Sequence, residues 1–254
     1  MKELFSVGVL SSLQIGLFLQ LIASMESKFH QGFSFANIFT IETNSPLSED
    51  ASKWTASVGT QHHYDWVHRY IINPFGWLLQ KPEWRTWRYG IERIYKHPDF
   101  QDNGMLYHDI ALLKLDGHAP VDSHPYVDLL PLPTADDVSI PTPLEYCIVT
   151  GWGCTADGGT LTDEQNWARI AVLPRSECKL QWPRMSDNQF CAGRPGEGVA
   201  VCSGDSGGPL ECKNGTHSYL AGIISFASSE EPEQHSSGFT YVAKYVSWIK
   251  SIIS

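Results

Sequence analysis

Short apolar runs separated by turn residues dominate the chain from residue 54 onward. Examples are residues 110–115, 147–150 and 219–226. Runs of this length at regular spacing predict the β-strands of a barrel or a sandwich. Residues 241–253 are the exception, because their apolar positions recur at the three- and four-residue spacing of an amphipathic helix. The pattern therefore predicts an all-β fold that ends in a helix.

The beginning of the chain has the pattern of an export signal. Apolar runs at residues 4–10 and 15–23 follow Lys2, and Ala23 and Ser24 are small residues near a suitable cleavage point. This order is typical of a secretory signal peptide, here residues 1–24. The alternatives are a membrane anchor, which the polar residues within the run disfavour, or a wrong start site. Residues 25–50 show no strong strand signal, so we expect the folded domain to cover residues 51–254.

Composition and charge exclude some partners. The chain is 42% hydrophobic and 18% charged, with a formal net charge of −10. Such a chain cannot neutralise phosphates, so we expect no nucleic-acid partner. All six cysteines lie between residues 147 and 212, and an even number in an exported chain suggests disulfides. No C-x-x-C pair occurs, so the cysteine spacings do not resemble a zinc site. We expect neither a metal nor a cofactor.

The most informative segment is Cys-Ser-Gly-Asp-Ser-Gly-Gly-Pro-Leu at residues 202–210. A serine between glycines can lie on a tight turn, where the backbone N–H groups of Gly204 and Ser206 would stabilise an oxyanion. The simplest alternative is a glycine-rich turn with an incidental serine. A nucleophile elbow of the α/β-hydrolase type needs a helix after the serine. Pro209 and the Asn214-Gly215 pair predict a strand and a turn instead, which excludes that alternative.

This block resembles the nucleophile loop of the chymotrypsin and trypsin family of serine proteases, and other blocks of that family follow the same order along the chain. They are His-Asp-Ile-Ala-Leu-Leu at 108–113, Thr-Gly-Trp-Gly at 150–153, Cys-Ala-Gly at 191–193, Ser-Phe-Ala at 225–227 and Tyr-Val-Ser-Trp-Ile at 245–249. The resemblance implies two six-stranded antiparallel β-barrels and a C-terminal helix. It also implies a serine endopeptidase in which Ser206 is the nucleophile and Asp109 orients a histidine.

The resemblance also implies a substrate class. The residues that correspond to the family's specificity pocket are Ala200, Ala227 and Ser237, and trypsin-like enzymes carry an aspartate in place of Ala200. The chain therefore looks most similar to pancreatic elastases and chymotrypsins, with an apolar residue preferred before the scissile bond. Ser225 and Phe226 would belong to the edge that pairs with the substrate backbone.

Disulfides follow from the same resemblance. It implies the pairs Cys147–Cys212 and Cys178–Cys191. In the family Cys202 would pair with a cysteine in the loop after residue 225, and this chain has none there. Cys154 is the remaining candidate, and that pair requires Cα atoms less than about 7 Å apart. The alternative is two free thiols.

The resemblance fails at the histidine block. The corresponding stretch, residues 38–44, contains neither histidine nor cysteine, and the Ile-Val-Gly-Gly start that pairs with the aspartate matching Asp205 is absent. We expect an incomplete first barrel, and His63 is the weak candidate that we retain for the missing base. We therefore expect negligible proteolysis by this chain. The alternative is a non-catalytic homologue that binds proteins through the cleft that corresponds to the family's substrate-binding site.

The remaining expectations concern the location, partners and glycosylation of the protein. We expect a secreted monomer that meets polypeptide substrates or protein inhibitors and has no membrane association after signal removal. Asn214-Gly215-Thr216 is an acceptor sequence for N-glycosylation in an exported chain.

Overall fold

The computed structural model describes most of the C-terminal two thirds of the chain in full and parts of the N-terminal third by backbone alone. Backbone and side chains are described for residues 92–114, 130–134, 139–151, 153–155, 159, 166–229 and 231–253. Backbone alone is described for residues 5–8, 11–12, 17–21, 35–37, 39–43, 55–61, 71–72, 87–91 and 115–116.

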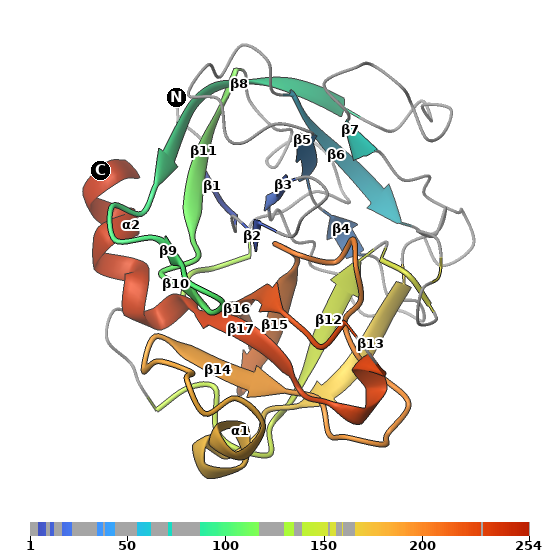
Figure 1. Ribbon diagram of the computed structural model, residues 1–254. Helices are drawn as coiled ribbons and strands as arrows, with labels where there is room; N and C mark the ends of the chain where they lie inside the picture. The colour runs from blue at the N-terminus through green and yellow to red at the C-terminus, as the bar shows by residue number, and fades with distance from the viewer. Residues whose placement is uncertain are drawn as a thin grey trace.

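Six antiparallel strands form the C-terminal half, which is the lower half of Figure 1. They are β12 (Tyr146–Gly151), β13 (Asn166–Ala171), β14 (Gln189–Ala192), β15 (Pro209–Asn214), β16 (His217–Phe226) and β17 (Ser237–Tyr241). The sheet order is β13-β12-β15-β16-β17-β14, and a bridge between Val172 and Ala192 joins the two ends. The sheet therefore closes on itself, and the expected six-stranded antiparallel barrel is confirmed.

Alternation of side chains explains why this barrel has a core. Along β12, Cys147 and Val149 are buried, while Tyr146 is exposed and Ile148 is half-buried. Period-two alternation sends one set of side chains inward, as a barrel requires. Phe239 of β17 and Leu210 of β15 belong to the same buried cluster.

The N-terminal half contains two sheets that lie above the closed barrel in Figure 1. Their strands are β1 (Phe5–Gly8), β2 (Ser11–Ser12), β3 (Leu17–Leu21), β4 (Phe35–Asn37), β5 (Phe39–Thr43), β6 (Thr55–Gln61), β7 (Ile71–Ile72), β8 (Trp87–Lys96) and β11 (Ala111–Asp116). One sheet has the order β1-β11-β8-β6-β4 and the other β2-β3-β5-β7, in which β5 and β7 are parallel. A separate hairpin consists of β9 (Gln101–Asp102) and β10 (Leu106–Tyr107).

Two predictions concern the N-terminal third of the chain. Residues 25–50, which show no strong strand signal, contain β4 and β5, and β4 pairs with β6 while β5 pairs with β3. Such short strands form because they pair with strands that are distant in the sequence, so a weak local pattern does not predict them. The domain boundary at residue 51 stays a prediction. The export signal at residues 1–24 stays a prediction, although residues 5–8 pair with β11 in this structure.

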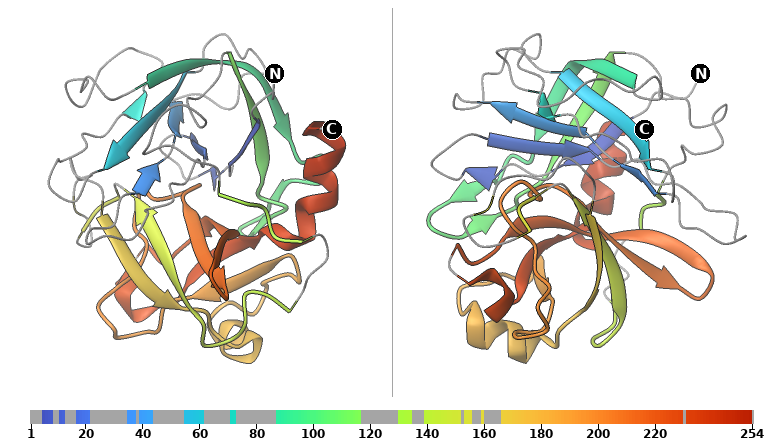
Figure 2. Two further views of the ribbon diagram at one scale, coloured as in Figure 1. Left: turned by 180° about the vertical axis from the view of Figure 1, so that it is seen from behind. Right: turned by 90° about the vertical axis from the view of Figure 1, so that its right-hand side faces the viewer.

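The predicted C-terminal helix is confirmed as α2 (Val246–Ile253), preceded by a 3-10 turn, η3, at Val242–Tyr245. Figure 2 shows α2 against the side of the molecule, next to strands of the N-terminal half. Ile249 of α2 shares a buried cluster with Ile110 and Leu112 near β11 and with Ile223 of β16. The helix therefore helps to join the two halves, and their junction positions the residues described next.

Two short helical elements were not predicted. They are α1 (Arg175–Gln181) and a 3-10 turn, η2, at Pro232–Gln234. Within the described residues no helix has both the length and the apolar character needed to cross a bilayer.

Candidate active site

Ser206 lines a cavity of about 520 Å³. The side chains that surround it are largely apolar, with several serine hydroxyl groups and one exposed carboxylate, that of Asp102. The lining residues used below are Met105, Leu106, Trp182, Ser203, Ser206, Ile224, Ser225, Phe226 and Ala227. A small, open, mostly apolar cavity with a few convergent polar groups is the usual form of a ligand site.

Backbone hydrogen bonds fix the turn that carries Ser206. Asp205 N donates to Cys202 O at 3.0 Å, and Gly208 N donates to Asp205 O at 2.9 Å. Gly207 N donates to Ile224 O at 2.8 Å, which ties the turn to β16. Gly204 and Gly207 have φ angles of +97° and +82°, a region that residues with a Cβ rarely adopt. The glycines on both sides of the serine are therefore required by the shape of the turn.

Asp109 lies behind this cavity and is only 1% exposed. The hydroxyl of Ser225, itself 1% exposed, donates to Asp109 Oδ2 at 2.7 Å. Thr240 Oγ1 donates to the backbone carbonyl of Asp109 at 2.7 Å. The carboxylate is therefore held by the strand, β16, that continues into the cavity wall at Phe226.

The far wall of the cavity is built from aromatic side chains. The rings of Trp182 and Phe226 meet edge to face, with centroids 5.1 Å apart. Trp182 Nε1 donates to both the carbonyl and the hydroxyl of Ser236 at 3.1 Å. The ring of Phe226 lies so close to Gly238 that a Cβ at this glycine would collide with it. The wall is therefore rigid, because both rings are fixed by contacts behind them.

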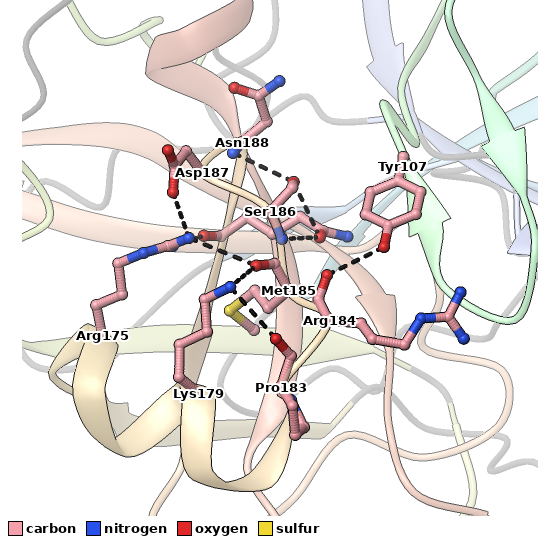
Figure 3. A network of polar contacts seen from close by, with 10 residues as sticks. Tyr107, Arg175, Lys179, Pro183, Arg184, Met185, Ser186, Asp187 and Asn188 are labelled. Atoms are coloured by element: carbon pink, nitrogen blue, oxygen red, sulfur yellow. Dashed lines mark hydrogen bonds and ion pairs between the residues drawn. The ribbon is translucent and has the colours of Figure 1, made fainter.

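A polar network, drawn in Figure 3, holds the segment between α1 and β14 against the β9–β10 hairpin. Arg175 donates to the carbonyl of Gln189 at 3.2 Å and pairs with Asp187 at 2.5 Å. Tyr107 Oη donates to the carbonyl of Arg184 at 3.1 Å, as Figure 3 also shows.

The same network reaches the cavity wall directly. Gln189 Nε2 donates to Leu106 O at 2.5 Å. Lys179 Nζ donates to the carbonyls of Pro183 and Met185. These contacts fix two walls of the Ser206 cavity, at Leu106 and at Trp182, relative to each other.

The residues expected to determine specificity lie in different places. Ala227 lines the Ser206 cavity. Ala200 lines a neighbouring cavity of about 450 Å³ that also contains Asp205. Ser237 is buried, and its hydroxyl accepts a hydrogen bond from Val201 N at 3.3 Å. Sequence reasoning missed Trp182, Met105 and Leu106, since nothing in their local sequence indicates that they approach the serine.

Asp205 lines the neighbouring cavity and accepts two hydrogen bonds. Its Oδ1 accepts from Gly153 N at 2.7 Å, and its Oδ2 accepts from Cys202 N at 2.9 Å. A Cβ at Gly151 or Gly153 would collide with this carboxylate. The Thr-Gly-Trp-Gly block therefore leaves room for the aspartate that precedes Ser206.

All three disulfides are present. Cys147–Cys212 and Cys178–Cys191 have Cα–Cα distances of 4.5 and 5.7 Å. The pair that the sequence left open, Cys154–Cys202, is bonded with a Cα–Cα distance of 5.4 Å. The alternative of two free thiols is therefore wrong. Among the described residues, the one group with metal-ligand spacing is Glu145 with Cys147 and Cys212, and its sulfurs are already in a disulfide.

None of the four described histidines bonds to Ser206 or to the Asp109 carboxylate. Two of them, His97 and His108, stack with ring centroids 4.9 Å apart, and Tyr245 Oη lies 3.2 Å from His108 Nδ1. Burial lowers the pKa of His97, and His108 lowers it further, whereas Asp99 raises it. Burial and the nearby Asp109 carboxylate raise the pKa of Tyr245.

The other two described histidines lie elsewhere. His217 is exposed at the end of a hairpin, and His235 packs near Trp182. His63 lies outside the described residues.

Comparison with known proteins identifies the family. The trypsin family model matches residues 78–249. The chain is 36% identical to trypsin from Squalus acanthias over 162 residues, which are 63% of this chain and 66% of that protein. It is 34% identical to human serine protease 1 over 164 residues, which are 64% of this chain and 62% of that protein. The chain thus spans slightly less than two thirds of the length of these relatives.

A solved structure agrees with this result. Neuropsin, described as a serine protease expressed in the limbic system of mouse brain, matches with a TM-score of 0.58 and 26% identity, covering 66% of this chain and 73% of that one. The match of the family model, the closed six-stranded barrel and the turn that carries Ser206 lead to one conclusion: the chain belongs to the trypsin family of serine proteases.

Proposed function

We propose that this chain carries the substrate cleft of a serine endopeptidase for polypeptides with an apolar side chain before the scissile bond. The observation that supports this most directly is the common location of Ser206, Ser225 and Phe226 on one cavity, with Asp109 hydrogen-bonded to Ser225 behind it. Family membership makes peptide-bond hydrolysis the chemistry to expect of such a cavity.

The chemistry that this site would perform begins at the Ser206 hydroxyl. Its oxygen forms a bond to the peptide carbonyl carbon, its proton passes to a base, and negative charge develops on the carbonyl oxygen. The backbone N–H groups of Gly204 and Ser206 would donate to that oxygen, and Asp109 would orient the base and stabilise its charged form.

We further propose that turnover by this chain is negligible. A serine hydroxyl is a weak nucleophile without an adjacent base. None of the four described histidines has a hydrogen bond to Ser206, and His97 and His108 stack with each other and contact Tyr245. Such a cleft would still bind peptides, so a protein-binding role through the same cavity is the second candidate function.

The apolar preference rests on the lining of the cavity. Met105, Trp182, Phe226 and Ala227 present apolar surface, and alanine occupies position 200, where a carboxylate would be needed to hold a basic side chain. The exposed carboxylate of Asp102 would stabilise a bound basic side chain only weakly, because surface ion pairs contribute only about 0–1 kcal/mol.

The proposed setting is an exported monomer that meets polypeptide substrates or protein inhibitors. Asn214 is exposed at the end of β15, and the chain turns at Gly215 to begin β16. An oligosaccharide at this hairpin would project into solvent, so we propose Asn214 as an N-glycosylation site of the exported form.

Peptide binding and turnover together test the proposed function. We expect Ala-Ala-Pro-Leu p-nitroanilide to bind more tightly than the matched peptide with arginine before the anilide. We expect the unmodified protein to cleave neither peptide faster than the Ser206→Ala variant does. Tighter binding of the arginine peptide would refute the apolar preference. Rapid cleavage of the leucine peptide that disappears in Ser206→Ala would refute the proposed lack of turnover.

A further inference from the structure

A third cavity, of about 330 Å³, shares no lining residue with the Ser206 cavity or with the neighbouring cavity that contains Asp205. It is lined by residues of α1, of β14 and of the segment at residues 139–143. Its volume falls within the range of about 300–1,000 Å³ that small-molecule sites occupy. The proposed function makes no use of this cavity, so its own chemistry has to indicate what it binds.

The floor of the third cavity is apolar and held in shape by contacts behind it. Val172 and Met185 line it and are 3% and 1% exposed. The rings of Phe190 and Tyr241, which also line it, meet edge to face with centroids 5.5 Å apart. Tyr241 Oη donates to Ile140 O at 2.7 Å, which holds the segment at residues 139–143 against β17. The cavity is therefore formed before any ligand arrives.

Arg175 contributes a fixed polar group to the wall of this cavity. Its Nη1 donates to Gln189 O at 3.2 Å, and its Nη2 donates to Met185 O at 3.5 Å and to Asp187 Oδ1 at 2.5 Å, as Figure 3 shows. These contacts use three of the five N–H groups of a guanidinium, and the other two have no partner among the described residues. The Asp187 side chain is 90% exposed, so water screens its charge. Arg175 can therefore still bind an anion.

Lys244 adds a second positive charge to the lining. It is exposed in η3, and its Nζ lies 5.9 Å from the centroid of the Tyr241 ring. Within the described part of the chain no carboxylate forms an ion pair with Lys244. Two cations, Arg175 and Lys244, and one carboxylate, Asp187, give the lining a net charge of +1. A ligand with one negative charge and an apolar body therefore matches both the charged wall and the apolar floor.

We propose that the third cavity binds a small carboxylic acid with an aromatic or aliphatic body, in its ionised form. The body packs against Val172, Met185 and Phe190, and the carboxylate accepts hydrogen bonds from Arg175 and Lys244. Hydrogen bonds in which both partners are charged are the stronger ones, which makes the carboxylate the group that selects the ligand. This site is separate from the Ser206 cavity and does not depend on the proposed function.

Two methionines allow the location of a bound acid to be observed. Met185 lines the third cavity, and Met105 lines the Ser206 cavity. In the full chain labelled with ¹³C at the methionine methyl groups, we expect 4-phenylbutyrate to shift the signal of Met185 and to leave that of Met105 in place. Met185→Leu and Met105→Leu assign the two signals. A shift confined to Met105, or no shift of either signal, would overturn the proposal.

Matched ligands separate the contribution of the charge from that of the body. The compound 4-phenylbutanamide keeps the body without the charge, and acetate keeps the charge without the body. By titration calorimetry we expect each to bind at least about tenfold more weakly than 4-phenylbutyrate, because each lacks one of the two contacts. Equal affinities for the acid and its amide would refute recognition of a carboxylate.

A pair of lysine variants tests the charged wall. Lys244→Met removes the ammonium group and keeps an apolar stem, so affinity for 4-phenylbutyrate should fall about tenfold while affinity for the amide stays unchanged. Lys250→Met is the matched control, because Lys250 is exposed on α2 and does not line the cavity. We expect the control to bind the acid as the unmodified protein does. Equal affinity for the acid in the two variants contradicts the proposal, and an unchanged Met105 signal in each verifies that the variant is folded.

Discussion

The hydrogen bond between Ser225 and Asp109 gives a quantitative test of how the aspartate is held. Ser225 Oγ lies 2.7 Å from Asp109 Oδ2, and both residues are 1% exposed. Ser225→Ala replaces the hydroxyl with a hydrogen atom and so removes the donor, and the space left by one buried oxygen atom is too small to hold a water molecule. A hydrogen bond to a charged group contributes about 1.5–3 kcal/mol, so we expect the free energy of unfolding to fall by about 2–3 kcal/mol.

Urea unfolding followed by tryptophan fluorescence measures this loss. The slope of the unfolding free energy against urea concentration should be the same in the variant, because the substitution does not change the surface that unfolding exposes. Ser251→Ala is the matched control, because the hydroxyl of Ser251 donates to Trp248 O at 2.6 Å on the surface. We expect the control to change stability by less than about 0.5 kcal/mol. Equal losses in the two variants would refute the argument from burial.

Three further predictions concern the surroundings of the cavity. Gly238→Ala should displace the Phe226 ring and weaken binding of leucine peptides, as measured by titration calorimetry. Because the pKa of His97 is lowered in the folded protein, the unfolded state binds more protons below about pH 6.5, and urea midpoints should fall as pH decreases through that region. Arg175→Met, which removes hydrogen bonds to two backbone carbonyls, should cost more unfolding free energy than Asp187→Asn, which removes only a surface ion pair worth about 0–1 kcal/mol.

Much of the C-terminal barrel could be predicted from the sequence, because its strands have clear local patterns. The run at residues 147–150 lies within β12, and the run at 219–226 lies within β16. The strand and turn expected after Pro209 are β15 and its hairpin, which confirms that no helix follows the nucleophile turn. The helix α1 was missed because it has only seven residues and buries only Cys178, so its apolar periodicity is too short to detect.

The candidate site could be predicted only as far as its residues carry local motifs. Ser206 and Asp109 belong to recognisable blocks, and the structure brings them to one cavity and the wall behind it. The Cys154–Cys202 bond depends on a Cα–Cα distance of 5.4 Å between residues 48 positions apart, which spacing along the chain does not determine. Trp182 and Leu106 reach the cavity through tertiary contacts alone.

The glycines of the site serve two purposes, and this explains why its motifs are so restrictive. Gly204 and Gly207 are needed for their positive φ, which forms the turn around Ser206. Gly153 and Gly238 are needed for space, because a Cβ would collide with the Asp205 carboxylate or with the Phe226 ring. The first kind of glycine determines the path of the chain and the second determines how closely two segments approach. A substitution of the first kind therefore alters the turn that carries Ser206, and one of the second kind displaces a side chain that lines the Ser206 cavity or the neighbouring cavity.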